Sequence, residues 1–176
     1  AAERTEILKF IDDNDIDNVV FMAGDFHGTI VNNLTYQEGP GQEQIATNAF
    51  EVVTGPVAFF DGRFGPNVAN LSAAAGFIGP EELAFYDSLP VAPDADDALN
   101  DKDDFIKQLL IGQTDLFGYD PVGLNNNLES AAGLIDATLL QGDYLSAHTY
   151  SWTEFDIASD SQKLLVTTYG IDVYSE

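Results

Sequence analysis

The chain has 176 residues, 45% of them hydrophobic and 11% aromatic, which is enough apolar material for one folded unit over residues 1–176 and excludes a disordered segment. Its 30 acidic and 6 basic residues give a net charge of −24, which excludes nucleic acids and anionic lipid headgroups as partners because both require lysine and arginine counter-charge. The chain has no cysteine, so disulfides and thiolate metal ligands are excluded, and it has no apolar run near the roughly 20 residues of a membrane span.

The first part of the chain predicts one helix and three strands. Apolar residues recur at helical spacing over residues 3–13, which predicts an amphipathic helix. Residues 18–23 form a continuous apolar and β-branched run, which is typical of a central strand buried on both faces. Residues 29–36 and 50–53 predict two further strands.

The remainder of the chain predicts helices followed by a hairpin. Four stretches have helical spacing or helix-capping signals: residues 67–75, 81–89, 98–110 and 124–140. Residues 149–157 and 163–169 then predict a β-hairpin with its turn at residues 158–161. Strands followed by helices and again by strands indicate an α+β fold, of mixed αββα order, or a mixed sandwich.

The segment Gly24-Asp25-Phe26-His27 carries the most informative chemistry. Asp25 and His27 follow the strand predicted at residues 18–23, and ligands commonly bind at the carboxyl ends of such strands. In extended backbone, residues two apart face the same side, so a carboxylate and an imidazole could converge on one cation or on two adjacent cations. Gly24 and Gly28 permit a tight loop. The alternative is an ordinary Gly-Asp turn with a loop histidine.

Several segments around this motif, and some much later in the chain, share one resemblance. They are Glu3-Arg4 with Ile7-Leu8-Lys9-Phe10-Ile11, Ile16-Asp17-Asn18-Val19-Val20-Phe21, Gly24-Asp25-Phe26-His27, Val53-Thr54-Gly55-Pro56, and Trp152-Thr153-Glu154-Phe155 to Tyr169-Gly170-Ile171-Asp172. Together they resemble the C-terminal portion of the catalytic domain of PhoD-like (alkaline phosphatase D) metallophosphoesterases. The first 36 residues carry the most specific part of the resemblance.

This resemblance implies a fold, a reaction and a metal site. The implied fold is part of a two-sheet sandwich flanked by helices. The implied enzyme is a metal-dependent phosphatase or phosphodiesterase that hydrolyses phosphate esters by attack of metal-bound hydroxide, with iron and calcium, or other divalent ions, as cofactors. Cations of this kind lower the pKa of bound water to about 7. Carried over by motif, Asp25 and His27 are the catalytic metal ligands.

The other ligand motifs of the family lie upstream and do not occur in this chain. They include an Asp-containing strand end, a Gly-Asp turn and a Gly-Asn-His segment. Since the chain has 2 histidines, we expect it to be inactive or nearly so in isolation, with the N-terminal portion of the same protein as its partner. The start at Ala1 rather than Met suggests processing, trimming or incomplete coverage.

The acidic composition adds two expectations. A charge of −24 is tolerated best where salt screens it, which favours a secreted or periplasmic and halotolerant protein. The rival to the enzyme is a non-catalytic acidic module that binds calcium or a partner protein. Calcium could bind the acidic stretch from Asp94 to Asp104, but a solvated loop and helix start is favoured because the stretch lacks the glycine and closing glutamate of a calcium-binding helix-loop-helix.

For four further candidates, a structural role is predicted rather than a functional one. His148 is predicted to be structural because no carboxylate stands at suitable spacing beside it. Arg63 could contact phosphate, although a salt bridge is favoured in so acidic a chain. The asparagines at residues 125–127 are predicted to cap a helix, and Trp152 to lie in the core.

Overall fold

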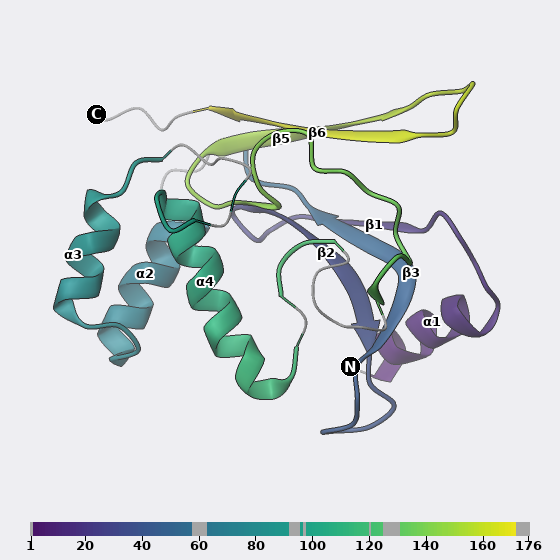
Figure 1. Ribbon diagram of the computed structural model, residues 1–176, viewed down its shortest axis with the longest axis horizontal. Helices are drawn as coiled ribbons and strands as arrows, with labels where there is room; N and C mark the ends of the chain where they lie inside the picture. Colours follow the sequence, from purple (N-terminus) through teal and green to yellow (C-terminus); the bar gives the residue numbers. More distant parts are fainter. Residues whose placement is uncertain are drawn as a thin grey trace.

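The computed structural model describes residues 2–57, 63–91, 96, 98–119, 121–124 and 131–171. Within these residues the fold comprises four α-helices, a four-stranded mixed sheet and a separate two-stranded hairpin (Figure 1). The α+β prediction is therefore confirmed. None of the described helices has both the length and the apolar character needed to cross a membrane.

The main sheet combines parallel and antiparallel pairing. Its strands are β1 (Val20–Ala23), β2 (Thr29–Tyr36), β3 (Ile45–Val53) and β4 (Leu145–Ser146), in the spatial order β1-β3-β2-β4. β1 runs parallel to β3, whereas β2 is antiparallel to both β3 and β4. The strands predicted in the first part of the chain are confirmed, with β3 starting five residues earlier than the predicted residue 50. β4 was not predicted, because two residues are too few to show a pattern.

The position of β1 corrects one prediction. Its apolar run was expected to be a central strand, but β1 lies at the edge of the sheet and pairs, among the described residues, with β3 alone. Met22 on this strand is 69% exposed. An apolar run therefore predicts a strand that is suited to burial on both faces. It does not predict which strands pair with that strand, and this pairing determines its place in the sheet.

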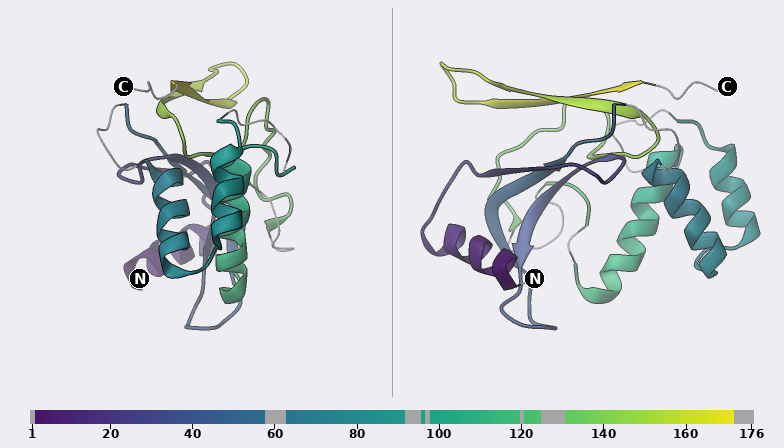
Figure 2. Two further views of the ribbon diagram at one scale, coloured as in Figure 1. Left: turned by 90° about the vertical axis from the view of Figure 1, so that its left-hand side faces the viewer. Right: turned by 180° about the vertical axis from the view of Figure 1, so that it is seen from behind.

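Helices lie at two ends of the sheet (Figures 1 and 2). The helices are α1 (Ala2–Asp13), α2 (Phe64–Ala75), α3 (Pro80–Ser88) and α4 (Lys102–Thr114), with a short 3₁₀ turn η1 (Asp115–Phe117) after α4. α1 packs against β2 and β3 around Leu8 and Leu34. α2, α3 and α4 pack together at the other end, where Ala69 and Ile106 join Leu145 of β4 in a second buried cluster.

Helix boundaries follow capping groups rather than apolar spacing. α4 begins at Lys102 instead of residue 98 because the Asp101 carboxylate accepts hydrogen bonds from the backbone N–H groups of Asp103 and Asp104. The helix predicted over residues 124–140 is wrong for residues 131–140, which form a turn and irregular backbone with Gly133 at φ 81°. Residues 125–130 lie outside the described part of the chain.

The predicted hairpin is confirmed as β5 (Tyr150–Ile157) paired with β6 (Leu164–Ile171). It lies along one side of the molecule, over the main sheet (Figures 1 and 2). The prediction that Trp152 lies in the core is wrong: this side chain is 45% exposed and stacks on Tyr169 across the hairpin, with 4.3 Å between ring centroids. A four-stranded sheet and a two-stranded hairpin do not by themselves make the two-sheet sandwich that the resemblance implies.

Candidate functional site

The predicted ligands Asp25 and His27 lie in the connection between β1 and β2, which we call the 24–28 loop (Gly24, Asp25, Phe26, His27 and Gly28). The loop follows the carboxyl end of β1, as the sequence predicted. Asp25 is exposed and His27 is half-buried. Both side-chain types are therefore placed where the sheet edge and solvent meet, which is a position from which they could reach a ligand.

The backbone of the 24–28 loop is not extended, so the argument from alternating side chains does not apply to it. Asp25 has φ 71° and His27 has φ 63°, both in the left-handed region. Aspartate is tolerated there, as Asp15 with φ 50° shows in an ordinary turn of this chain. A histidine held in the same conformation costs roughly 1 kcal/mol and persists only when its surroundings fix it, which is a frequent property of functional loops.

The surroundings that fix this loop come from α2 and from the segment around β4. The backbone N–H of Phe64 donates a hydrogen bond of 3.0 Å to the carbonyl oxygen of His27. The rings of Phe26 and Phe64 lie with centroids 3.8 Å apart. A Cβ at Gly28 would meet the Phe64 Cβ and the Ser146 carbonyl oxygen at 3.2 Å, so this approach requires glycine.

The donor types of the loop suit a metal ion, but two donors are fewer than a metal site needs. A carboxylate oxygen and an imidazole nitrogen suit divalent and trivalent cations of intermediate hardness. Across the described residues, however, no group of three or more histidine or acidic side chains is placed to hold a metal ion. The 24–28 loop can therefore offer two donors, and no other described histidine or acidic side chain completes a group of three with them.

A cavity of about 290 Å³ borders the 24–28 loop at Phe26. Phe26 and Phe64 contribute to its lining, together with Asn32, Glu51 and Tyr119. Neither Asp25 nor His27 is among the described residues that line it. The cavity is consequently not a substrate pocket centred on the proposed ligands.

His148 has the structural environment that the sequence predicted. Its side chain is 1% exposed, with Nδ1 2.6 Å from Asp103 Oδ1 and Nε2 2.7 Å from the Tyr86 hydroxyl. Because an ionised carboxylate can only accept, Nδ1 of the ring donates to Asp103, and the tautomer with its proton on Nδ1 leaves Nε2 to accept from the Tyr86 hydroxyl. Burial, with a smaller contribution from the charge of Asp87, raises the pKa of Tyr86, which keeps this hydroxyl protonated.

The partners of His148 could not be found from local spacing. Asp103 precedes it by 45 residues and Tyr86 by 62 residues, on α4 and α3 respectively. The absence of a nearby carboxylate in the sequence was therefore a poor guide to the bonding of His148, although the structural assignment is confirmed. Asp103 Oδ1 accepts a second hydrogen bond, of 2.8 Å, from the backbone N–H of Ala147.

The acidic stretch from Asp94 to Asp104 divides into an exposed loop and a buried helix start. Asp96 and Asn100 are exposed, whereas Asp101, Asp103 and Asp104 are all at most 3% exposed. Asp101 Oδ1 and Asp104 Oδ2 accept from backbone N–H groups at the start of α4, and Asp103 Oδ1 accepts from Ala147 and His148. Asp103 Oδ2 is buried and has no hydrogen-bond partner among the described residues. Burial raises the pKa of Asp104, although hydrogen bonds from Asn100 and Asp101 oppose this effect.

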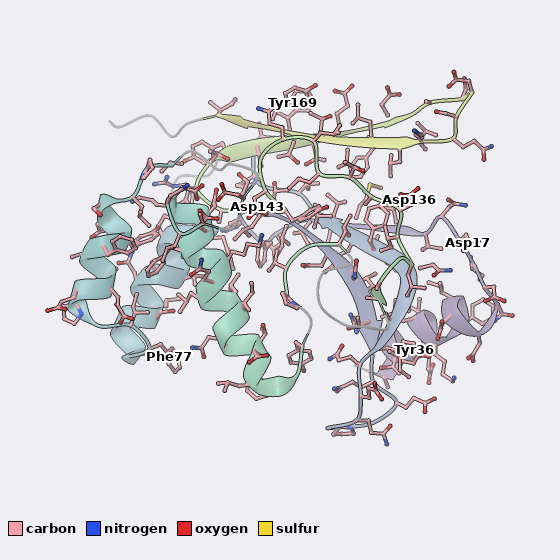
Figure 3. All side chains as sticks on the ribbon, in the orientation of Figure 1. Asp17, Tyr36, Phe77, Asp136, Asp143 and Tyr169 are labelled. Carbon is pink, nitrogen blue, oxygen red and sulfur yellow. The ribbon has the colours of Figure 1, made fainter. Side chains whose placement is uncertain are left out.

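A buried ion pair lies beside these aspartates. Lys107 Nζ is 2.8 Å from Asp143 Oδ1, with both side chains at most 8% exposed, and Asp143 lies next to the N-terminal end of α4 (Figure 3). The predictions of a helix start and of a solvated loop are confirmed for the described residues, whereas the aspartates of the helix start are buried rather than solvated. Asp94 and Asp97 lie outside the described residues.

Within the part of the chain that the structure describes, the side chain of Arg63 bonds to a backbone carbonyl, whereas the sequence favoured a salt bridge. Its Nη1 donates a hydrogen bond of 3.3 Å to the carbonyl oxygen of His148. Arg63 thus ties the start of α2 to the segment after β4. The asparagines predicted to cap a helix at residues 125–127 lie outside the described residues.

Comparison with known proteins identifies a family. The model of the PhoD-like phosphatase family matches residues 1–100, which include the elements from α1 through the 24–28 loop to the end of α3. No curated protein and no solved structure matches the chain. Since the match covers more than half of the 176 residues, the chain belongs to the PhoD-like phosphatase family.

Proposed function

We propose that this chain contributes Asp25 and His27 as metal ligands to an enzyme that hydrolyses phosphate monoesters or diesters. Membership of the PhoD-like phosphatase family implies phosphoesterase activity, and the family is generally metal-dependent. The observation that carries the proposal is the 24–28 loop itself. It lies within the family match, follows the end of β1, and holds a carboxylate and an imidazole in left-handed backbone.

The residues of the chain would act by holding these two donors in place. The loop is anchored through the His27 carbonyl and the Phe26 ring, both of which contact Phe64. Such anchoring lowers the ordering cost of binding a cation, because the donor-bearing backbone is fixed before the cation arrives. Asp25 would supply a carboxylate oxygen and His27 a ring nitrogen.

We propose iron and calcium, or other divalent ions, as the cations, in line with the family. When bound, such cations lower the pKa of ligated water towards about 7 and neutralise the charge of the phosphoryl group. The absence of cysteine supports oxygen and nitrogen ligation. A secreted or periplasmic, halotolerant protein remains a prediction from the net charge of −24.

We also propose that an N-terminal portion of the same protein, outside these 176 residues, completes the site. Two observations support this proposal. The described histidine and acidic side chains form no group of three that could hold a metal ion, and the outer edge of β1 pairs with no described strand while Met22 on that strand is 69% exposed. An apolar parallel strand with one open edge is suited to cover by a further strand or helix, which would also extend the sheet towards a two-sheet sandwich.

The experiment is a phosphatase assay on the protein as its gene encodes it. We expect Asp25→Ala and His27→Ala each to lower kcat/KM for a chromogenic phosphate ester by at least about 100-fold, since each removes a ligand of the metal on which turnover depends. Asp15→Ala is the matched control, because Asp15 is likewise an exposed aspartate with left-handed backbone, in the turn before β1. This control should retain wild-type turnover.

Circular dichroism would establish that all three variants fold. If folded Asp25→Ala and His27→Ala proteins hydrolysed the ester at the wild-type rate, these residues would not be ligands. Equal losses in all three variants would assign the effect to the backbone of the turns rather than to the two donors.

A further inference from the structure

The buried network of Asp103, His148 and Tyr86 reaches the 24–28 loop through a short series of contacts. We propose that this network positions the loop and thereby sets the metal affinity of His27, an inference that rests on the proposed function. The three residues do not touch the metal in this proposal. They are positioning residues, which act through the backbone that holds His27.

The first contacts fix the segment after β4. Asp103 Oδ1 accepts hydrogen bonds from His148 Nδ1 at 2.6 Å and from the backbone N–H of Ala147 at 2.8 Å. Tyr86 holds the other ring nitrogen of His148 at 2.7 Å. Two helices, α3 and α4, therefore hold both the ring and the adjacent backbone of one short segment.

The next contacts connect that segment to the start of α2. The carbonyl oxygen of Ala147 accepts a hydrogen bond of 3.0 Å from the backbone N–H of Gly65. The carbonyl oxygen of His148 accepts from Arg63 Nη1 at 3.3 Å. Residues on both sides of Phe64 are thus bonded to the segment that carries His148.

Close packing makes this connection rigid. A Cβ built on Gly65 would lie closer than 3.0 Å to three atoms of the His148 ring, so the ring packs directly on the backbone of α2. A shift of the ring must therefore shift the first turn of α2, because no side chain lies between them to absorb the movement.

The last contacts lead from α2 to the proposed ligand. The Phe64 N–H donates to the carbonyl oxygen of His27, and the Phe64 ring lies against Phe26. His27 adopts φ 63°, a conformation that its surroundings must maintain. The His148 ring is consequently connected to the backbone of His27 through the first turn of α2.

Tyr86→Phe is the sharpest variant, because it removes one hydroxyl and leaves the ring, Asp103 and Gly65 in place. We expect the full-length enzyme carrying Tyr86→Phe to bind Ca²⁺ or Mn²⁺ roughly fivefold to tenfold more weakly, measured by isothermal titration calorimetry of the metal-stripped protein. At saturating metal its kcat should return to within about twofold of wild type, since the ligands themselves are intact.

Tyr36→Phe is the matched control. Tyr36 is also 3% exposed, and its hydroxyl donates to Asp12 Oδ2 at 2.8 Å. Figure 3 shows Tyr36 beside α1, at the other end of the sheet from α2, α3 and α4. Both variants lose one buried hydroxyl bond, but we expect Tyr36→Phe to keep its metal affinity within twofold of wild type.

His27→Ala separates the two proposals. If His27→Ala weakens metal binding while Tyr86→Phe matches Tyr36→Phe, the positioning role is overturned and the ligand role of His27 stands. If His27→Ala binds metal as tightly as wild type, the proposed function itself fails. Equal weakening in both tyrosine variants would also overturn the positioning role, because it would reflect general stability.

Discussion

The two histidines of this chain occupy opposite environments. His27 is half-buried, lies on a loop at the sheet edge and has left-handed backbone. His148 is 2% exposed, and each of its ring nitrogens is hydrogen-bonded to a residue of a different helix. The comparison teaches that a loop histidine proposed as a metal ligand and a buried histidine of the core can be connected through the first turn of one helix, α2.

The two regions also differ in what holds them. The region of His148 combines a buried carboxylate, a tyrosine hydroxyl and direct ring-to-backbone packing, so small changes in volume should be costly there. The 24–28 loop has an exposed aspartate and retains backbone strain, so relief of that strain should stabilise the fold. Replacing a glycine beside His148 tests the packing of the first region. Introducing a glycine into the 24–28 loop tests the backbone strain of the second.

The largest effect should follow from Gly65→Ala. The added methyl group would collide with the His148 ring, and we expect a loss of about 3 kcal/mol in the free energy of unfolding. Gly112→Ala in α4 is the matched control, because a Cβ there meets no atom within 4 Å and the position is exposed. That change should stabilise the protein by about 0.5 to 1 kcal/mol, since alanine is the better helix former.

Urea unfolding followed by circular dichroism measures both changes. A Gly65→Ala protein as stable as wild type would show that the His148 ring can move without cost, which would remove the basis of the contrast. Destabilisation by Gly112→Ala would show that the difference between the two positions does not arise from packing.

A smaller effect of opposite sign should follow from Asp25→Gly. Glycine adopts the left-handed conformation freely but costs more entropy on folding, so we expect a net gain of about 0.5 kcal/mol. Asn18→Gly, at φ 62° in an exposed turn, should give a similar or smaller gain. We expect phosphatase activity to fall in the first variant alone. Loss of activity in both variants would mean that strain relief, rather than loss of a ligand, impairs the enzyme.

Local sequence pattern predicted the parts of the fold that local chemistry determines. The strand at residues 29–36 has the predicted bounds, and the helix predicted over residues 3–13 begins one residue earlier. The predictions failed where the structure depends on pairing between segments that are distant in the sequence. The edge position of β1 depends on which strands lie beside it, and β4 exists because residues 145–146 meet β2.

The site follows the same division. Asp25 and His27 were identified because both donors lie within four residues of one motif, whereas the bonding of His148 depends on Asp103 and Tyr86, 45 and 62 residues away. The burial of Asp101 was equally hidden, because an acidic stretch ordinarily predicts solvation. Residue spacing in the sequence cannot predict contacts between side chains that the fold brings together from separate helices.

The most direct measurement is the metal content of the full-length protein, determined by elemental analysis per mole of chain. We predict that the Asp25→Ala/His27→Ala double variant, folded as judged by circular dichroism, loses at least one bound metal ion relative to wild type. A double variant that keeps the full metal complement would contradict the assignment of these two side chains as ligands.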